Sequence, residues 1–144
     1  MSIFCTLTIE SESTSMLPNA FLKAGARSNV RFIDLGSPEW VSRRRRIRKK
    51  WGQSDVPVPV ARYLWQLCSQ DFVTSEDIHD HLAWIFDCIT PPLSLAEHLH
   101  DEYAYHLSTY WGFDGPGGGP TILLKTSELL AKHKVKLQIS LYPE

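Results

Sequence analysis

Three segments of this chain alternate apolar and polar residues with a period of two, and this alternation limits the fold more than any other feature. In residues 2–10, one side of the predicted strand carries Ile3, Cys5, Leu7 and Ile9. Residues 103–111 and 135–141 repeat the pattern. Such alternation predicts β-strands that are buried on one face only. We therefore expect a mostly antiparallel sheet, because the doubly buried strands of parallel sheets are more uniformly apolar.

Helical periodicity is clearest between Thr74, which is a suitable cap, and Thr90, where Pro91 and Pro92 end the pattern. Its apolar face recurs at helical spacing and consists of Ile78, Leu82, Ile85, Phe86 and Ile89. Shorter helices are predicted at residues 16–26, 93–100 and 127–133, the last with Thr126 or Ser127 as its cap. Two further strands are predicted at residues 30–35 and 61–69.

These elements predict a single α+β domain spanning residues 1–144. We expect a mostly antiparallel sheet of four to five strands, with two or three helices packed on one face. The first and last strands, at residues 2–10 and 135–141, are both well formed. We expect these two strands to pair at the centre of the sheet.

The composition is typical of an ordinary soluble globular domain, with 43% hydrophobic and 22% charged residues. No apolar run approaches the ~20 residues that cross a bilayer, and the N-terminus lacks the pattern of a signal peptide. Cys5, Cys68 and Cys88 are odd in number and widely spaced, which favours reduced thiols over a disulfide framework. We therefore expect a cytoplasmic location and no membrane partner.

Charge is distributed unevenly along the chain. Residues 41–52 read VSRRRRIRKKWG, and seven of the eight positions from Arg43 to Lys50 are basic. Outside this run the chain holds 8 Lys and Arg against 16 Asp and Glu, a net charge of −8. The segment between Tyr63 and Leu124 has no Lys or Arg but nine carboxylates. A charge layout of this kind bears on partners and association rather than on fold.

Short motifs along the chain resemble those of a small bacterial family catalogued as a domain of unknown function. The matching residues are the strand from Phe4 to Ile9, Trp65-Gln66-Leu67, Gly119-Pro120-Thr121-Ile122, Leu129-Leu130 and Ile139-Ser140-Leu141-Tyr142. The resemblance implies an α+β fold and a bacterial cytoplasmic protein. It also implies a similarity to immunity proteins, which neutralise toxins exchanged between competing bacteria. It implies no catalytic residue.

No motif indicates an enzyme, a metal site or a cofactor. His79 and His81 would point about 200° apart on a helix and cannot chelate one ion together. Asp77 and His81 are better spaced, but a metal needs three or four converging ligands, so we interpret this segment as a solvated polar face. The glycine-rich stretch at residues 112–120 lacks the Lys-Ser/Thr of a P-loop. We therefore expect a non-enzymatic protein with no catalytic residues, metal or cofactor.

The leading hypothesis is an immunity protein that occludes the basic cleft of a toxin domain with an acidic surface. Opposite charges would steer such an association and raise its rate. Trp84 and Trp111 are candidate anchors, since exposed aromatic residues dominate many interfaces. The acidic candidates for partner binding are Asp77, Asp80, Asp87, Glu97, Asp101, Glu102 and Asp114.

The alternative hypothesis is a nucleic-acid-binding or regulatory protein that uses the basic run. Lys and Arg neutralise phosphates, and Trp40 and Trp51 could stack on bases. The acidic remainder of the chain would repel a polyanion unless the basic run faced away from it. The run is also open to two other interpretations: a mobile loop that continues to residue 58, or an internal counter-charge. Its basic residues are Arg43, Arg44, Arg45, Arg46, Arg48, Lys49 and Lys50.

Overall fold

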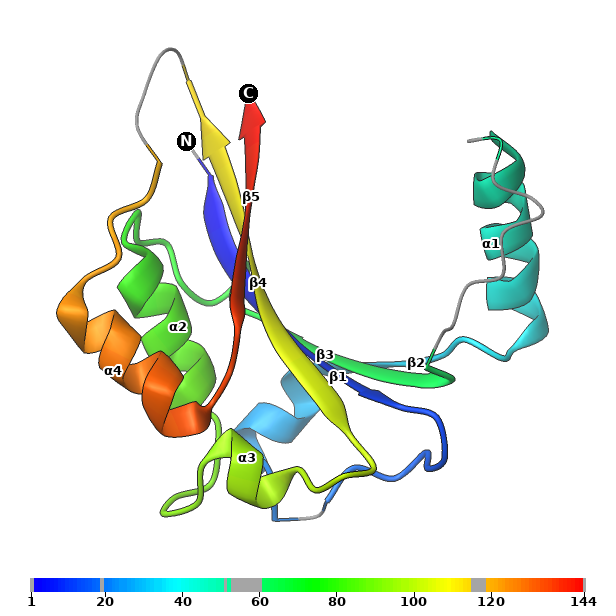
Figure 1. Ribbon diagram of the computed structural model, residues 1–144, viewed down its shortest axis with the longest axis horizontal. Coiled ribbons are helices and arrows are strands. Elements are labelled where there is room, and N and C mark those ends of the chain that lie inside the picture. Colours follow the sequence, from blue (N-terminus) through cyan, green and yellow to red (C-terminus); the bar gives the residue numbers. More distant parts are fainter. Residues whose placement is uncertain (1, 19, 51, 53–60, 115–118, 144) are drawn as a thin grey trace.

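A five-stranded sheet organises the chain (Figure 1). The computed structural model describes residues 2–18, 20–50, 52, 61–114 and 119–143. The elements along the chain are β1 (Ile3–Ser11), η1 (Ala24–Asn29, a 3₁₀ helix), β2 (Val30–Asp34), α1 (Pro38–Lys50), β3 (Tyr63–Cys68), α2 (Ile78–Asp87), α3 (Leu95–His98), β4 (Ala104–Phe113), α4 (Leu124–His133) and β5 (Leu137–Pro143).

The strands lie side by side in the order β2-β3-β1-β4-β5. Three of the four neighbouring pairs are antiparallel, and β4 with β5 is parallel. The predicted α+β class with a mostly antiparallel sheet is therefore confirmed.

β1 is the central strand, and its alternation places its apolar residues in the core. The side chains of Cys5, Leu7 and Ile9 are all buried. Leu7 pairs with Leu67 of β3 and with Leu107 of β4, and both partners are also buried. Cross-strand neighbours of this kind contact one another directly, so one apolar row runs without a break across three strands.

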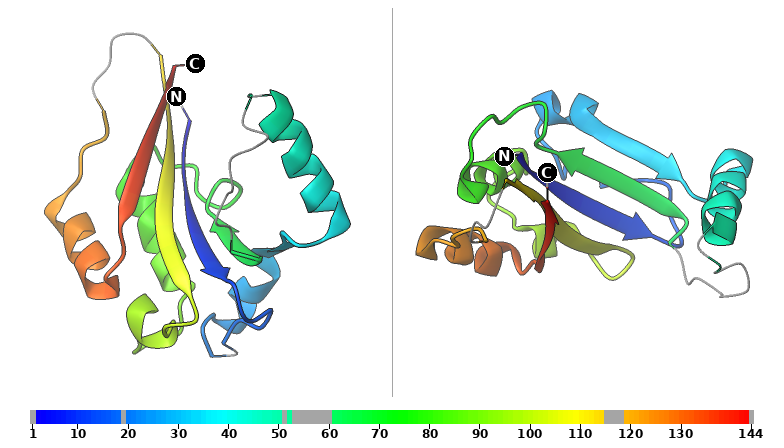
Figure 2. Two further views of the ribbon diagram at one scale, coloured as in Figure 1. Left: turned by 45° about the vertical axis from the view of Figure 1, so that its right-hand side comes forward. Right: turned by 90° about the horizontal axis from the view of Figure 1, so that it is seen from above.

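Four helices cover this apolar face of the sheet, namely η1, α2, α3 and α4 (Figures 1 and 2). Their buried side chains, together with those of the loop before η1, complete the core, and include Phe21, Ala26, Ile78, Leu82, Ile85 and Leu95. We call the opposite side of the sheet the open face. The pairing registers assign to it Phe4, Thr6, Thr8 and Glu10 of β1, Arg31 and Ile33 of β2, Leu64, Gln66 and Cys68 of β3, Ala104, His106, Ser108 and Tyr110 of β4, and Gln138, Ser140 and Tyr142 of β5.

The N-terminus of α2 differs from the predicted one. The helix begins at Ile78, and its cap is Asp77 rather than Thr74. The Asp77 carboxylate accepts a hydrogen bond from the backbone N–H of His79 at 2.8 Å. A carboxylate at this position satisfies an otherwise unpaired N–H and suits the positive end of the helix dipole.

α4 begins at Leu124, three residues before the predicted start, and its cap residue is Leu123. Thr126 and Ser127 are therefore not caps, contrary to the prediction. Thr126 is fully buried instead, and its hydroxyl lies 2.9 Å from Nδ1 of His79 on α2. This contact joins the two covering helices, which explains why a small polar residue occupies a buried position in α4.

The helix predicted at residues 16–26 is absent. The backbone around Leu22 is extended and forms a bridge with Ile89, just after α2. The N–H of Lys23 donates to the carbonyl of Cys88 at 2.9 Å, and the N–H of Thr90 donates to the carbonyl of Phe21 at 3.0 Å. These long-range bonds satisfy the backbone better than an isolated helix would, and only the short η1 forms downstream.

The first and last strands do not pair, which corrects the expectation that they meet at the centre of the sheet. β4 lies between them, and β5 occupies the edge. β4 and β5 are parallel, so the chain must return to its starting end between them. α4 provides that return, as helices commonly do between parallel strands.

The basic run forms the helix α1 rather than a loop. Pro38 occupies its first position, Glu39 its first turn, and Arg48, Lys49 and Lys50 its last turn. Each placement suits the helix ends and their dipole, and Arg and Lys are good helix formers. Residues 53–58 of the predicted connection lie outside the described residues.

α1 does not pack on the apolar face with the other helices. It follows β2 and stands on the side of the open face, apart from the strands (Figures 1 and 2). None of its residues is buried. The expectation that helices pack on one face therefore holds for η1, α2, α3 and α4, whereas α1 is an additional, exposed element.

Two histidines, His81 and His98, are buried, although His81 is predicted to lie on a solvated polar face. His81 is fully buried, with Nδ1 at 2.8 Å from the Ser69 hydroxyl and Nε2 at 2.8 Å from the carbonyl of Ser75. The Ser69 hydroxyl also accepts from the backbone N–H of Cys5 at 2.9 Å. His98 is buried with Nε2 at 2.8 Å from the carbonyl of Thr90. Buried polar groups need such partners, and each ring joins its helix to the segment that precedes it.

His133, at the end of α4, is held in its neutral form. Its Nδ1 accepts a hydrogen bond from the backbone N–H of Leu95 at 3.0 Å, and its ring stacks on Phe86 with centroids 4.2 Å apart. Burial, with Lys132 nearby, lowers the pKa of His133 below its ordinary value of 6.5. A proton on Nδ1 would abolish its role as acceptor and leave the N–H of Leu95 without a partner.

We predict that the free energy of unfolding falls as the pH drops below about 6.5. Because the pKa of His133 is lower in the folded chain than in the unfolded chain, the unfolded chain binds more protons in this range, and stability decreases. Urea unfolding at pH 7.5, 6.5 and 5.5 would measure the effect. His133→Gln should have a smaller pH dependence than the natural chain, and an identical pH dependence would contradict this assignment.

Candidate functional site

The exposed helix α1 carries seven of the 15 Lys and Arg residues of the chain. Its seven cations point in nearly every direction around the helix axis, as their positions along a helix of 3.6 residues per turn require. Two of them, Arg44 and Arg48, are half-buried and lie on one side with Trp40. The fully exposed cations are Arg43, Arg45, Arg46, Lys49 and Lys50.

Trp40 lies in the first turns of α1 and is in contact with one of these cations. The guanidinium of Arg43 lies over its indole ring, 4.8 Å from the ring centroid. Such a cation–π contact fixes the orientation of both side chains and contributes about 0.5–1 kcal/mol at an exposed site. Trp51, the second aromatic residue proposed to stack on bases, lies outside the described residues.

The open face, on the same side of the molecule as α1, is polar and aromatic. Successive rows across the strands carry hydroxyl, amide and imidazole groups, such as the row of Arg31, Gln66, Thr8 and His106. Glu10 is the one carboxylate among the residues of this face. The face therefore offers hydrogen-bond donors and acceptors with little negative charge.

An aromatic column crosses the open face. The rings of Phe4 and Tyr110 are stacked, with centroids 4.8 Å apart and planes inclined by 6°. Tyr110 stacks in turn on Tyr142, at 4.7 Å and 13°. The three rings belong to β1, β4 and β5. Phe4 pairs directly with Tyr110, whereas Tyr142 pairs with Gly112, so the column crosses from β4 to β5 diagonally. Sequence alternation could not reveal it, because the register between strands decides which aromatic residues meet.

The carboxylates of the acidic segment lie mainly on the other side of the sheet. Asp77, Asp80 and Asp87 belong to α2 or its cap, and Glu97 belongs to α3. Both helices cover the apolar face, whereas α1 stands beside the open face (Figure 2). The sheet therefore separates the basic helix from the carboxylates of α2 and α3. This arrangement removes the main objection to a polyanionic ligand, because the basic run faces away from them.

Several of the acidic candidates have local structural partners. Asp77 caps α2, and Asp80 accepts a hydrogen bond from the Ser75 hydroxyl at 2.6 Å. Glu97 belongs to a capping box, where the backbone N–H of Ser94 donates to its carboxylate at 2.7 Å. This hydrogen bond, with that of the Ser94 side chain, lowers the pKa of Glu97.

Asp87 is different, since its exposed carboxylate contacts only the exposed ammonium of Lys23 in the described part of the chain, at 3.1 Å. Exposed ion pairs contribute at most about 1 kcal/mol, so this carboxylate stays accessible to a partner.

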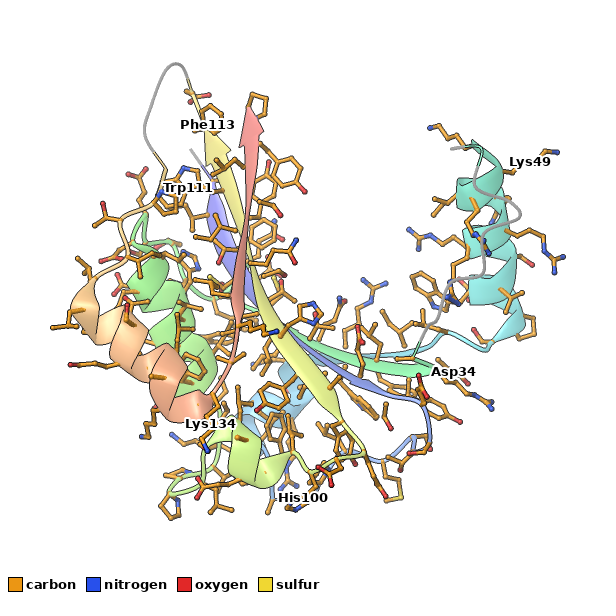
Figure 3. All side chains as sticks on the ribbon, viewed as in Figure 1. Asp34, Lys49, His100, Trp111, Phe113 and Lys134 are labelled. Carbon is orange, nitrogen blue, oxygen red and sulfur yellow. The ribbon has the colours of Figure 1, made fainter. Side chains whose placement is uncertain are left out.

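The acidic candidates do not form one continuous surface. Asp77 and Asp87 stand at opposite ends of α2, which at 1.5 Å per residue places them about 15 Å apart. Asp101 follows His100 and Asp114 follows Phe113, and Figure 3 shows His100 and Phe113 at opposite ends of the molecule. The structure thus brings Asp101 and Glu102 together but separates them from Asp114.

Trp111 is buried, which corrects its interpretation as an exposed anchor. Only 8% of its surface is exposed. It pairs with Ile3 of the central strand, on the covered side of the sheet. Trp84 is half-buried, and its ring stacks on Phe72 with centroids 4.8 Å apart. Since Phe72 is exposed, this pair still forms an apolar spot on the surface.

One acidic corner of the molecule was missed by sequence reasoning. Asp101 and Glu102 line a surface pocket of about 400 Å³ together with Glu10 and Glu12. The four carboxylates come from two segments that are far apart in sequence, the end of β1 and the turn before β4. β1 and β4 are antiparallel, and Glu10 pairs with Ala104, so the register of this ladder brings them together.

The described residues contain no group of three or more His, Cys, Asp or Glu side chains able to hold a metal ion. Burial raises the pKa of the Cys5 thiol to about 12, and it also raises the pKa of Cys88. Both thiols are therefore protonated at neutral pH, which suits a structural role better than a nucleophilic one. Among the described residues, no helix is both long enough and apolar enough to cross a bilayer.

The chain was compared with protein-family models, with curated proteins and with solved structures, and none of them matches it. The resemblance to a bacterial family of unknown function, and to immunity proteins, therefore stays a prediction.

Proposed function

We propose that the protein binds nucleic acid, with helix α1 as its phosphate-binding element. The observation that carries the proposal is the exposed helix with seven cations and no buried residue, separated by the sheet from the carboxylates of α2 and α3. A helix with no apolar face to bury contributes little to the core. Its charge is therefore better explained by a ligand than by folding.

Binding would rest first on electrostatics. Each phosphate neutralised by Arg or Lys releases condensed counterions, so the affinity falls as the salt concentration rises. The five fully exposed cations of α1 set the upper limit of phosphate contacts that need no rearrangement of the helix. At a slope of about −0.7 per contact on single strands, these contacts would give a steep salt dependence.

A replacement of four cations tests the role of α1. Arg45, Arg46, Lys49 and Lys50 occupy its outer side, away from Trp40. We predict that changing all four to Gln weakens binding to a 20-nucleotide oligonucleotide about 100-fold at 0.1 M salt. The slope of log K against log salt should become shallower by up to about 3. Fluorescence anisotropy at four salt concentrations would measure both quantities.

A matched control removes the same charge from a different place. Lys125, Lys132, Lys134 and Lys136 are all exposed, on α4 or just after it. Their joint replacement by Gln should change affinity by less than about threefold. Both variants should retain the melting temperature of the natural chain, because surface substitutions usually change stability by under about 0.5 kcal/mol. Equal loss in both variants would mean that net charge, and not α1, governs binding.

A second candidate function is neutralisation of a toxin with a basic cleft. The acidic corner formed by Glu10, Glu12, Asp101 and Glu102 favours it, because a concave acidic surface complements a basic partner. In this case α1 would have no part in the activity, and the accessible carboxylates would determine the rate of association.

The toxin hypothesis has its own test in bacterial cells. The product of a neighbouring gene, if it arrests growth, should be neutralised by co-expression of this protein. Glu12→Lys combined with Asp101→Lys and Glu102→Lys should abolish protection, since charge reversal opposes steering. The four replacements in α1 should leave it intact. Protection that survives reversal of the acidic corner would refute this role for these carboxylates.

A further inference from the structure

We infer that the ligand is a single-stranded polynucleotide and that one of its unpaired bases stacks on Tyr142, at the end of the aromatic column. The inference rests on the proposed function and deepens it. α1 accounts for attraction to phosphate but does not by itself distinguish one strand from two. The column and the open face provide that distinction.

The geometry of the column decides where a base can bind. The rings of Phe4, Tyr110 and Tyr142 stack face to face, at 4.8 Å and 4.7 Å. These distances match the spacing between neighbouring strands, so the rings stand upright on the sheet rather than lying flat on it. Tyr110 is enclosed by its neighbours on both faces. A further ring can therefore join the column only at its ends.

Tyr142 is the more exposed end, because Phe4 at the other end is half-buried. It belongs to β5, the edge strand, which pairs only with β4 in the described part of the chain. One face of its ring contacts Tyr110, and 47% of the residue is exposed. A base placed on its outer face would extend the stack by one ring. Stacking of this kind needs only the π-face that every base has.

The polar residues of the open face provide hydrogen bonds for neighbouring nucleotides. Gln138 lies on β5, two rows from Tyr142, and Ser108 and Thr6 continue its row across β4 and β1. The next row adds His106 and the cation Arg31. These side chains are exposed or half-buried. Hydroxyl, amide and guanidinium groups suit the edges of unpaired bases and the phosphates beside them.

A double helix cannot use this surface in the same way. Its bases are stacked on one another, and only their edges are reachable through the grooves. A duplex also cannot place a base face on Tyr142 without unpairing. Sheet surfaces bearing aromatic and polar side chains therefore favour unpaired strands. Charge complementarity supports the same occupant, because α1 stands on the side of the open face and Glu10 is the one carboxylate among the described residues of that face.

Three probes test the inference: 20-nucleotide oligo(U), 20-nucleotide oligo(dT) and a 20-base-pair duplex of mixed sequence, each with a fluorescent label. Anisotropy at 0.1 M salt should show tighter binding of a single strand than of the duplex by at least tenfold. Comparison of oligo(U) with oligo(dT) separates RNA from DNA as the preferred strand. Equal affinity for the duplex and both single strands would overturn the inference.

Substitution of Tyr142 provides the second measurement. Tyr142→Leu removes the ring but keeps an apolar strand residue, and we predict that it weakens oligo(U) binding about 5- to 150-fold. Tyr142→Phe keeps the ring and should bind like the natural chain. Neither change should alter the slope of log K against log salt, because no charge is lost. A Tyr142→Leu variant with unchanged affinity would refute the role of this ring.

A matched control guards against a structural effect of the edge strand. Leu141 is the neighbour of Tyr142 on β5, is 55% exposed, and points to the opposite side. Leu141→Ala should leave binding unchanged. Thermal melting of the Leu141 and Tyr142 variants shows whether β5 remains in place. An equal loss of affinity in Leu141→Ala would trace the effect to the strand and overturn the assignment to Tyr142.

Different results would refute nucleic-acid binding and the preference for a single strand. If none of the three probes binds the natural chain, nucleic-acid binding itself is wrong. If all three bind equally and only the α1 replacements weaken them, the proposed function stands and the single-strand inference falls. Photocrosslinking with 5-iodouridine placed in oligo(U) gives an independent readout, since the crosslinked peptide should contain Tyr142.

Discussion

The pairing of β1 with both β3 and β4 is the constraint on which the other parts of the structure depend. The central strand joins two ladders, and Leu7 stands between Leu67 and Leu107 in one buried row. The covering helices pack against that row. A slip of one residue in either ladder would turn the core side chains to the opposite side. The register of β1 with β4 also brings Phe4 beside Tyr110 and assembles the acidic corner.

Only one face of the sheet is buried, and the other face therefore remains available to a ligand. Four helices shield the apolar face of the sheet, and the open face keeps polar and aromatic side chains. The carboxylates of α2 and α3 lie on the covered side of the sheet, while α1 stands on the other side. A chain whose net charge is −1 thereby presents two regions of opposite sign. The first function proposed above rests on α1, and the second rests on the acidic corner of Glu10, Glu12, Asp101 and Glu102.

Local patterns predicted the strands and the α2 helix well, because alternation and helical spacing are properties of a single segment. Contacts between segments escaped prediction. The sequence predicts His81 as a polar helix residue, because its own segment does not show the contact with Ser69. It predicts Trp111 as an exposed aromatic residue, because the burial of Trp111 depends on formation of the sheet. α1 was missed for another reason: it has high helix propensity but no apolar stripe, and that stripe is the signal by which helices are recognised in sequence. Tyr110 and Tyr142 became neighbours only through the parallel β4–β5 register.

The position of α1 in the chain has a consequence for how the protein can change over evolution. β2 and β3 are antiparallel neighbours, and Asp34 pairs with Tyr63, so residues 35–62 are an insertion at the tip of a hairpin. The entropy cost of closing such a connection grows only slowly with its length. The basic helix is therefore part of a connection between two strands. The sequence and length of this connection can change, or the helix can be lost, while the sheet and its core persist. Ligand preference and fold can then evolve separately in this chain.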